Sequence, residues 1–451
     1  VTSMSRPWLS MENKAFATVA DNMKRIAIIG AGISGLTAGY ELKKMGFDVT
    51  VYEKEALVGG RMSTRVKDGF HFDIGADHLC NLYFHMKDYC KEFGIEWDRM
   101  QFDKYGLIKK HQTIALGEGV NVLSKLRMGW HALTMKKVDE LFDFNLIADH
   151  DIENAKHYAE RKLGKEASIY YVDGFTSAYQ FHRSDEISIA PFLAIMNSIK
   201  RDGPLWNLHR TKGGMIALPQ QLANRLNVKT STTVRSVTGN TVTLESGESE
   251  TFDAVIVTAP APIALKLITD PTPETKHVLE QSKFAATISL TFKIQKDLAP
   301  KRGVTWVPFV ESEIVASISN QAMKGDDCTI GDTSLVSIWL HEAAALELMK
   351  KSDEEVSRVV RDELVRVTDW LTSASQLELH DLQRWDYAMP KFATGHQKLV
   401  RDYLKNHQGK NHLYLCGDYM NALWTEGALR YGQRLAARIK TDLDSSSATQ
   451  R

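Results

Sequence analysis

Four residues near the start of the chain have the types and spacing that bind a dinucleotide. Gly30, Gly32 and Gly35 form the pattern GxGxxG, and Glu53 follows 18 residues after Gly35. In this pattern the first glycine permits a tight turn, the second lets backbone N–H groups approach a pyrophosphate, and the third allows a helix to pack closely on a strand. A carboxylate at the position of Glu53 can accept both hydrogen bonds of a ribose diol.

The elements that must position these residues occur in the required order. Residues 26–29 form an apolar run that predicts a buried parallel strand, and the glycines begin a helix that ends near Gly46. A second strand is expected over residues 49–53. The N-terminus of the helix would bind the phosphates, because its unpaired N–H groups and its dipole favour negative charge. The complete order favours a dinucleotide site over a βαβ unit that only packs.

A second glycine pair follows the first motif closely. Gly60 and the glycine before it precede Arg61, so backbone donors and a guanidinium can reach the same pyrophosphate. This arrangement suits a cofactor that is held permanently. Ser34, within the first motif, and Lys54, beside Glu53, complete the cofactor contacts expected in this part of the chain.

Three stretches resemble the flavin-containing amine oxidase superfamily, which also includes protoporphyrinogen oxidases and carotenoid desaturases. They read GAGISGLTAGYEL, VYEKEALVGGRMSTR and GFHFDIGADHL, and residues 413–438 resemble the closing strand and helix of the same family. The resemblance implies an FAD cofactor, with Asp418 near its ribityl or phosphate region. It also implies that the helix beginning near Glu426, Gly427 and Ala428 points its N-terminus at the flavin, where the helix dipole would stabilise the reduced ring.

The same resemblance implies further contacts around the ring. Gly75 and Ala76 would lie in a loop over the flavin, and Val234 would contact the adenine through its backbone. His78 follows in the same loop and is either catalytic or a hydrogen-bonded structural histidine. Trp424 stands where amine oxidases carry an aromatic residue that flanks the substrate, and the alternative is a tryptophan of the core.

The predicted fold is α/β, with a Rossmann-like FAD-binding domain built from discontinuous segments and a substrate domain of mixed sheet and helices. The FAD-binding segments are residues 24–85, 206–268 and 386–442, and the substrate domain comprises residues 86–205 and 269–385. Residues 1–23 form a polar N-terminal extension without the apolar region of a secretory signal, and residues 443–451 form a tail.

Outside the FAD motifs, apolar spacing predicts several elements. Helices are expected over residues 82–100 and 353–371, and strands near residues 286–294, 304–318 and 334–340. An aromatic cluster either lines a substrate chamber or packs a core. Its members are Tyr170, Tyr171, Phe175, Tyr179 and Phe181.

The composition restricts the class of partner. Lys plus Arg and Asp plus Glu number 56 each among 451 residues, so the formal charge is zero and indicates neither nucleic acid nor an anionic membrane surface as an obligate partner. The four cysteines show no metal-ligand spacing, which predicts reduced core residues and no metal site. No apolar run is long enough to span a membrane, and we expect a cytoplasmic protein.

Two departures from the family pattern limit what the resemblance implies. Monoamine oxidases of this family attach the flavin to a cysteine shortly before the closing strand. This chain has none between Cys328 and Cys416, so noncovalent FAD is expected. Many amine oxidases also place a lysine in the middle of a strand near the flavin. Ser289 aligns with that lysine here, and Lys283 and Lys293 are displaced along the strand, which weakens the hypothesis of primary-amine oxidation.

The expected function is removal of a hydride from a small, largely apolar substrate to the flavin N5, creating a C=N or C=C bond. O2 is the expected electron acceptor. Two alternatives come from other classes. An NAD-dependent dehydrogenase would leave the second glycine motif and the closing helix without a purpose. A non-redox binding protein of the GDP-dissociation-inhibitor type would lack the phosphate-cradling residues that this chain keeps.

Overall fold

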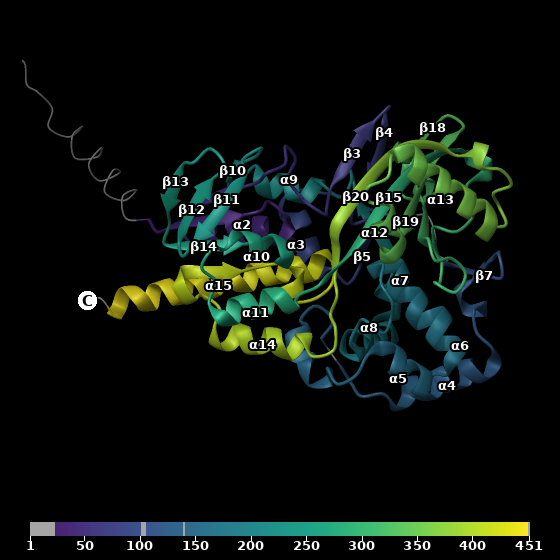
Figure 1. The fold of residues 1–451 in the computed structure, drawn as a ribbon, viewed down its shortest axis with the longest axis horizontal. Coiled ribbons are helices and arrows are strands. Elements are labelled where there is room, and N and C mark those ends of the chain that lie inside the picture. The colour runs from purple at the N-terminus through teal and green to yellow at the C-terminus, as the bar shows by residue number, and fades with distance from the viewer. Residues whose placement is uncertain (1–22, 101–104, 139, 450–451) are drawn as a thin grey trace, which may run out of the picture.

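The computed structural model describes residues 23–100, 105–138 and 140–449, which form two lobes (Figure 1). One lobe is built on a parallel sheet and carries the long C-terminal helix. The other contains a larger mixed sheet and a group of helices at its lower end (Figure 1). Both lobes combine helices with strands, which confirms the predicted α/β class.

The first lobe contains a five-stranded sheet in the order β10-β2-β1-β14-β21, with every neighbouring pair parallel. Its strands come from distant parts of the chain. They are β1 (Arg25–Ile29), β2 (Asp48–Tyr52), β10 (Asn227–Lys229), β14 (Ala254–Val257) and β21 (Leu413–Leu415). The central strands β1 and β14 are nearly continuous apolar runs, as expected where both faces of a parallel sheet are covered.

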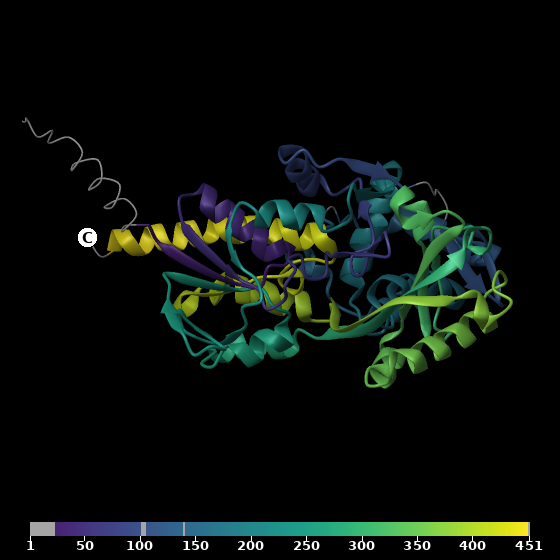
Figure 2. The same ribbon diagram turned by 90° about the horizontal axis from the view of Figure 1, so that it is seen from above.

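Helix α2 (Ile33–Lys44) and the C-terminal helix α15 (Trp424–Thr449) pack together on one side of this sheet (Figure 2). Their approach is close, because a Cβ atom on Gly432 would collide with the carbonyl oxygen of Ser34. The other side carries three short antiparallel strands and further helices (Figure 2). These are β11 (Val234–Thr238), β12 (Thr241–Leu244), β13 (Ser249–Thr251), α10 (Ala261–Leu267), α11 (Pro273–Gln281) and α14 (His396–Asn406).

The second lobe is built on a sheet in the order β20-β15-β19-β17-β16-β7-β8, with β18 paired to β19. The long strands β15 and β20 are antiparallel neighbours and run from this lobe toward the first. The strands are β7 (Gly106–Lys109), β8 (Gln112–Ala115), β15 (Phe284–Gln295), β16 (Val304–Trp306), β17 (Val315–Asn320), β18 (Thr329–Ile330), β19 (Thr333–Leu340) and β20 (Glu378–Pro390).

This lobe contains two groups of helices. Helices α12 (Glu342–Leu348) and α13 (Asp353–Val367) join its strands in one apolar core, to which α13 contributes Val356, Val360 and Leu364. The other group lies at the lower end of the lobe (Figure 1). It comprises α4 (Val122–Thr134), α5 (Ala155–Lys162), α6 (Lys165–Ala167), α7 (Gly174–Gln180) and α8 (Ile189–Asp202).

Three sequence-based predictions of elements need correction. The helix predicted over residues 82–100 is α3 (Phe84–Glu92), and β6 (Trp97–Arg99) follows it because this segment pairs with β9 (Leu208–Thr211). The strand predicted over residues 304–318 is two strands, β16 and β17, with a turn between them. The helix predicted to residue 371 ends at Val367.

Two further features bear on the site. Within the described ranges, no helix has both the length and the apolar character needed to cross a bilayer. The four cysteines are buried and unpaired. Burial raises the pKa of the Cys416 thiol to about 12, so this thiol is protonated at neutral pH.

Candidate functional site

The glycines of the first motif lie where β1 passes into α2. Gly30 has φ +108°, and a Cβ there would lie 2.6 Å from Thr258 Oγ1. A Cβ on Gly35 would collide with the carbonyl oxygen of Gly30, so only glycine permits this packing of helix on strand. At Gly32, by contrast, a Cβ would meet no atom within 4 Å. Crowding at two glycines and open space at the third are what a phosphate cradle requires.

The second glycine turn lies beside the first. The Gly59 N–H donates to the Ala31 carbonyl oxygen over 2.8 Å, and Gly59 forms a parallel bridge with Gly32. Gly60 has φ +56°, and a Cβ there would lie 3.7 Å from the Cα of Gly32. The two turns therefore frame one space at the N-terminus of α2.

Glu53, just after β2, has a buried side chain. Its Oε2 accepts from the Ala31 N–H over 2.8 Å, and its Oε1 accepts from the Glu55 N–H over 3.0 Å. The Thr232 N–H donates to the Glu53 carbonyl oxygen over 2.8 Å, which holds the turn before Val234 beside this carboxylate. Each carboxylate oxygen has a further lone pair, so Glu53 can also accept from a ribose diol.

Two of the predicted contact residues differ in their access to this space. Ser34 is buried in the first turn of α2, close to the cradle. The Lys54 side chain is 71% exposed, and its Nζ lies 3.2 Å from Glu55 Oε1. The ammonium of Lys54 therefore faces solvent, whereas Ser34 lies among the glycines.

Arg61 and Asp418 form a two-bond ion pair. Arg61 Nη1 lies 2.7 Å from Asp418 Oδ2, and Nη2 lies 3.0 Å from Oδ1. Nη1 also donates to the carbonyl oxygen of Ala388 over 2.8 Å. Asp418 follows Gly417 at the end of β21, so the ion pair connects the second glycine turn to the last strand of the parallel sheet.

The first turn of α15 contains Glu426, whose side chain binds the start of α3. The fully buried carboxylate of Glu426 accepts from the backbone N–H groups of residues 85 and 86, both over 3.0 Å, at the N-terminus of α3. It also accepts from Arg430 Nε over 2.8 Å. The side chain of Glu426 therefore binds the start of α3, and the carbonyl oxygen of Gly427 accepts from Asn421 Nδ2 over 2.6 Å.

Trp424 begins α15 with an unusual backbone conformation. Its φ is +69°, which is rare for a bulky residue and costs about 1–3 kcal/mol. The indole is partly buried and lies edge-on to the rings of Trp206 and Phe142, with centroids 6.1 Å and 6.5 Å away. Strain of this kind persists where the surrounding structure enforces it, and it is enriched at functional sites.

The loop that follows β4 (Phe70–Asp73) packs directly on Arg61. The Ala76 N–H donates to the Arg61 carbonyl oxygen over 2.7 Å, and a Cβ on Gly75 would collide with the same oxygen. The Ile74 carbonyl oxygen accepts from Trp385 Nε1 over 3.0 Å. The loop is thereby held between the second glycine turn and β20.

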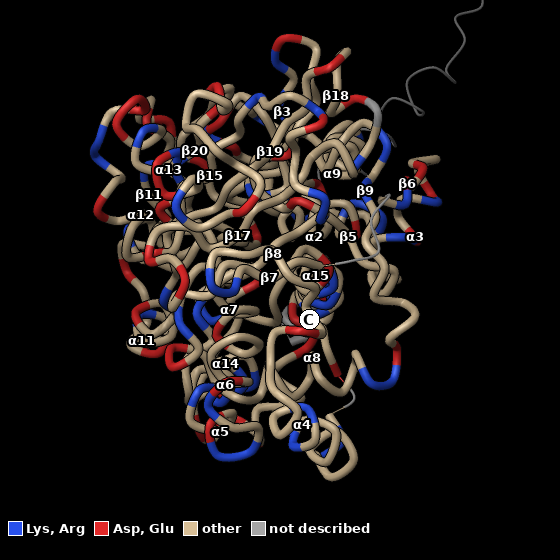
Figure 3. The backbone as a smooth tube through the Cα atoms, turned by 90° about the vertical axis from the view of Figure 1, so that its right-hand side faces the viewer, with Lys and Arg blue, Asp and Glu red and all other residues tan. Residues whose placement is uncertain are grey.

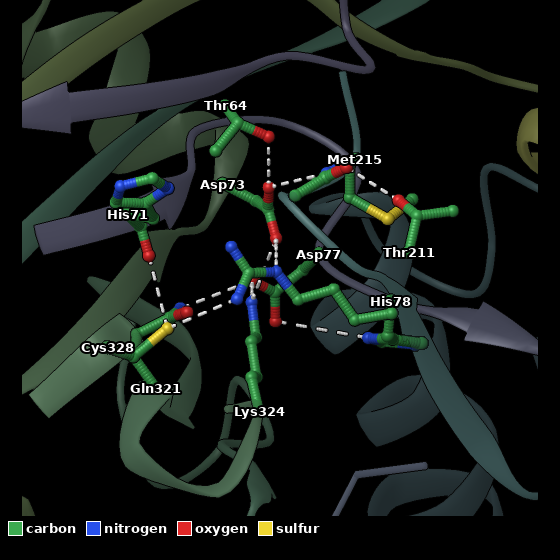
Figure 4. A network of polar contacts seen from close by, with 12 residues as sticks. Thr64, His71, Asp73, Asp77, His78, Thr211, Met215, Gln321, Lys324 and Cys328 are labelled. Atoms are coloured by element: carbon green, nitrogen blue, oxygen red, sulfur yellow. Dashed lines mark hydrogen bonds and ion pairs between the residues drawn. The ribbon is translucent and has the colours of Figure 1, made fainter. Parts of the chain in front are cut away.

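A set of charged residues, most of them buried, lies at this loop, and we call it the charge cluster (Figure 4). Its members are Asp73, Asp77, Arg210, Lys324 and Asp327. Lys324 is paired with Asp77, and its Nζ lies 3.9 Å from Asp73 Oδ2. Arg210 Nε lies 3.2 Å from Asp73 Oδ2, and Arg210 Nη1 lies 2.7 Å from Asp327 Oδ1. The side chains of Lys324 and Arg210 are only 0% and 3% exposed.

Neutral donors complete the charge cluster. Asp77 accepts from Ser319 Oγ over 2.8 Å and from Gln321 Nε2 over 3.2 Å. Thr64 Oγ1 donates to Asp73 over 2.6 Å. Burial by itself would raise the pKa of Asp77, but the ammonium of Lys324 and hydrogen bonding hold it well below its usual range. Asp77 is therefore ionised, and the cluster joins the loop rigidly to the second lobe.

His78 stands between the charge cluster and the predicted aromatic cluster. Its Nδ1 lies 3.9 Å from Asp77 Oδ2, and its ring is edge-on to Tyr179, with centroids 5.8 Å apart. The rings of Phe175 and Trp306 pack on the ring of Tyr179, with centroids 5.0 Å and 6.0 Å away. The structure thus brings the histidine and part of the aromatic cluster together, whereas Phe181 stacks separately on Trp339.

The strand lysine of the family pattern has a different local setting here. Ser289 on β15 is buried and donates to the Ile74 carbonyl oxygen over 3.4 Å. The Nζ of Lys293 is bound to Asp68 over 3.1 Å. The buried lysine beside the loop is Lys324, whose place in a polar stretch with Gly325 gives no sequence signal of burial.

Comparisons with known proteins agree with this geometry. The model of a family described as flavin containing amine oxidoreductase matches residues 33–440. The probable flavin-containing monoamine oxidase A of Dictyostelium discoideum is 22% identical over 467 residues, covering 93% of this chain and 98% of the relative. Protoporphyrinogen oxidase 2 of Arabidopsis thaliana is 26% identical over 207 residues, covering 43% of this chain and 38% of the relative.

Solved structures share the fold over almost the whole chain. Wild-type putrescine oxidase bound to putrescine has a TM-score of 0.72 and 19% identity, covering 93% of this chain and 99% of that one. A putative protoporphyrinogen oxidase from Exiguobacterium sp. 255-15 has a TM-score of 0.72 and 18% identity, with the same coverage. At these identities the likeness concerns the fold.

Proposed function

Because the chain belongs to the flavin-containing amine oxidoreductase family and is an FAD-dependent oxidoreductase, we propose that it oxidises a small, largely apolar substrate by hydride removal. The product carries a new C=N or C=C bond, and O2 is the proposed final electron acceptor. Bound FAD supplies the hydride acceptor. The single observation that carries the proposal is the open space at Gly32, framed by two glycine turns.

We propose that this chain binds FAD along the whole length of the cofactor. We assign the adenosine end to Glu53 and the backbone at Val234, because a buried carboxylate with free lone pairs lies beside that turn. The backbone at Gly32 and Gly60 would bind the pyrophosphate. The complete proposed set is Gly30, Gly32, Ser34, Gly35, Glu53, Gly60, Arg61, Gly75, Ala76, Val234, Asp418, Gly427 and Ala428.

Two earlier candidates have lesser proposed roles. Lys54 contributes positive charge near the ribose from the solvent side, because its ammonium is exposed. Glu426 acts indirectly by capping α3, which fixes the start of α15 through a buried carboxylate. Neither side chain needs to contact the cofactor in this proposal.

On the substrate side, the chain orients the reactant and excludes water. Trp424 is the proposed wall, because its strained backbone holds a large flat side chain rigidly at the start of α15. His78 lies in the loop after β4, and its ring is edge-on to Tyr179. Both side chains would contact the substrate from the side opposite Trp424. The apolar rings of Phe175 and Trp306 favour an apolar substrate. We name no general base.

The test uses the purified full-length protein. It should absorb in the blue, and acid precipitation should release FAD into the supernatant, since no cysteine lies between Cys328 and Cys416 to attach it. Anaerobic addition of a panel of amines and of cyclic compounds with saturated C–C bonds should bleach the flavin with at least one class. Absence of flavin, or colour retained on the precipitated polypeptide, contradicts the cofactor assignment. Bleaching by NADH alone would contradict the substrate assignment.

A further inference from the structure

Helix α4 carries its apolar side chains on the outside of the molecule. Five of its six large apolar residues are more than half exposed, namely Val122, Leu123, Leu126, Trp130 and Leu133, whereas Met128 is partly buried against the core. The buried residues of the helix are instead polar, namely Ser124 and His131. An ordinary surface helix has the opposite arrangement, because burial of apolar area stabilises the fold.

The exposed residues form one continuous face, which we call the α4 stripe. At about 100° per residue, the five apolar side chains fall within an arc of roughly 100°. Lys125 and Arg127 border this arc on its two sides, and Ser124 and His131 lie opposite. The stripe is therefore a narrow apolar band between two basic margins.

Polar bonds fix this orientation of α4. Asn121 caps its N-terminus by accepting from the Ser124 N–H over 2.8 Å. His131 Nε2 lies 2.7 Å from the Tyr158 hydroxyl on α5, and Lys200 Nζ on α8 donates to the Ala132 carbonyl oxygen over 2.6 Å. A rotation that hid the stripe would break the contacts to α5 and α8, so the apolar face is held outward.

The charged side chains of α4 and its flanking residues are all basic, although Glu166 of α6 accepts from the Asn121 N–H at the N-terminus of α4. Residues 119–138 contain four Lys or Arg residues and no Asp or Glu, although the whole chain is formally neutral. Helix α4 lies at one extremity of the molecule, at the lower edge of Figure 3, with no other labelled element beyond it. The neutral composition therefore conceals a local basic and apolar surface.

We propose that the α4 stripe docks the holoenzyme on the surface of a bilayer that contains anionic lipids. An interfacial helix lies in the membrane plane with its apolar face buried about 5–10 Å deep and basic side chains at the phosphates. Trp130 has the amphipathic ring that favours the interface. A second copy of the chain is a poorer occupant, because symmetric pairing of two stripes would oppose basic margins with basic margins.

The test is flotation of FAD-loaded full-length protein with vesicles. Vesicles of about 70% phosphatidylcholine and 30% phosphatidylglycerol should carry the protein upward, and vesicles of phosphatidylcholine alone should carry much less. The double variant Leu126→Ser with Trp130→Ser should lower the bound-to-free ratio by about tenfold or more. Lys125→Gln with Arg127→Gln should reduce binding to the anionic vesicles only.

Leu346→Ser is the matched control, because Leu346 is 59% exposed on α12 in the same lobe. It should float as the unchanged protein does. FAD content and the thermal midpoint of every variant should match the unchanged protein, since all of these side chains are exposed. The proposal is overturned if the unchanged protein stays unbound, if the stripe variant floats equally well, or if light scattering finds a dimer that Trp130→Ser dissociates.

Discussion

Arg61 and Asp418 are 357 positions apart in the sequence and form a two-bond ion pair of 2.7 Å and 3.0 Å. The carboxylate is 7% exposed and the guanidinium 32% exposed. The pair joins the turn after the second glycine motif to the end of β21. It therefore holds together the two ends of the chain that the proposed cofactor would contact.

The first prediction concerns this pair. Asp418→Asn should lower the stability of the FAD-loaded protein by about 1–3 kcal/mol, because it leaves the guanidinium of Arg61 without its charged partner. It should also weaken FAD retention during gel filtration. Asp149→Asn is the control, since Asp149 is 82% exposed in its pair with Arg401 and should leave stability almost unchanged. Equal urea midpoints for both variants would remove the proposed role of Asp418.

The second prediction concerns Gly32. Its φ of −73° and the open space around it allow a side chain in the folded protein without collision. Gly32→Val should therefore fold and lose FAD, because the side chain would occupy the space proposed for the pyrophosphate. Absorbance at the flavin band after purification measures the loss, and circular dichroism checks the fold.

Two other glycines serve as controls for that experiment. Gly117→Val has the same open surroundings at a site away from the cradle and should keep its FAD. Gly35→Val should impair folding itself, because its side chain would meet the carbonyl oxygen of Gly30. If Gly32→Val retained one FAD per chain, the phosphate site would lie elsewhere.

The third prediction concerns pH and the charge cluster. The pKa of Asp77 is held below its usual range with Lys324 beside it, so the contribution of Asp77 to stability is present above the usual carboxyl pKa of about 4 and lost on acidification below it. In Lys324→Met the burial of Asp77 would raise its pKa, although His78 and Arg210 remain nearby. Stability of this variant should then fall as the pH rises above about 4.

Thermal midpoints at pH 5 and pH 8 test this sign. The difference in thermal midpoint between the unchanged protein and Lys324→Met should be larger at pH 8 than at pH 5. Lys293→Met removes a lysine whose partner Asp68 is 59% exposed, and its gap should be small and similar at both pH values. A gap for Lys324→Met that is independent of pH would mean that Asp77 does not depend on this ammonium.

The fourth prediction separates the side chain of Trp424 from its backbone. Trp424→Ala should keep FAD and slow substrate bleaching by about tenfold, if about 1.4 kcal/mol of positioning is lost. Trp424→Gly should slow bleaching similarly but be more stable than Trp424→Ala by about 1 kcal/mol, because glycine adopts φ +69° without strain. An unchanged bleaching rate would show that the indole is a core side chain and does not position the substrate. Greater stability of the alanine variant would show that the strain is absent.

Much of the candidate cofactor site could be predicted from the sequence. The roles of Gly30, Gly32 and Gly35 depend on turn geometry and on contacts between neighbouring elements, which a short motif specifies. The family, the α/β class and the FAD cofactor were predicted in the same way, and the comparisons confirm them. The assignments of individual residues to FAD and the division into domains remain predictions.

The partners of charged side chains could not be predicted. Lys324 stands in a polar stretch typical of a surface loop, yet its side chain is fully buried against Asp77, 247 positions away. Glu426 was predicted to contact the flavin, which stays a prediction, and its bond to α3, about 340 positions earlier in the chain, had no signal in the sequence. Such pairings depend on long-range packing, which local spacing does not encode.

Local patterns in the sequence by themselves determined that a glycine turn at Gly30 leads into a helix and that an amphipathic helix begins at residue 353, because both depend on near neighbours. Only the tertiary structure decided which way such elements face. The period of α4 is the same whether Leu126 or His131 is buried, and the surrounding polar bonds bury His131. Residues 97–99 likewise became a strand because β9, more than a hundred residues later, offers backbone partners.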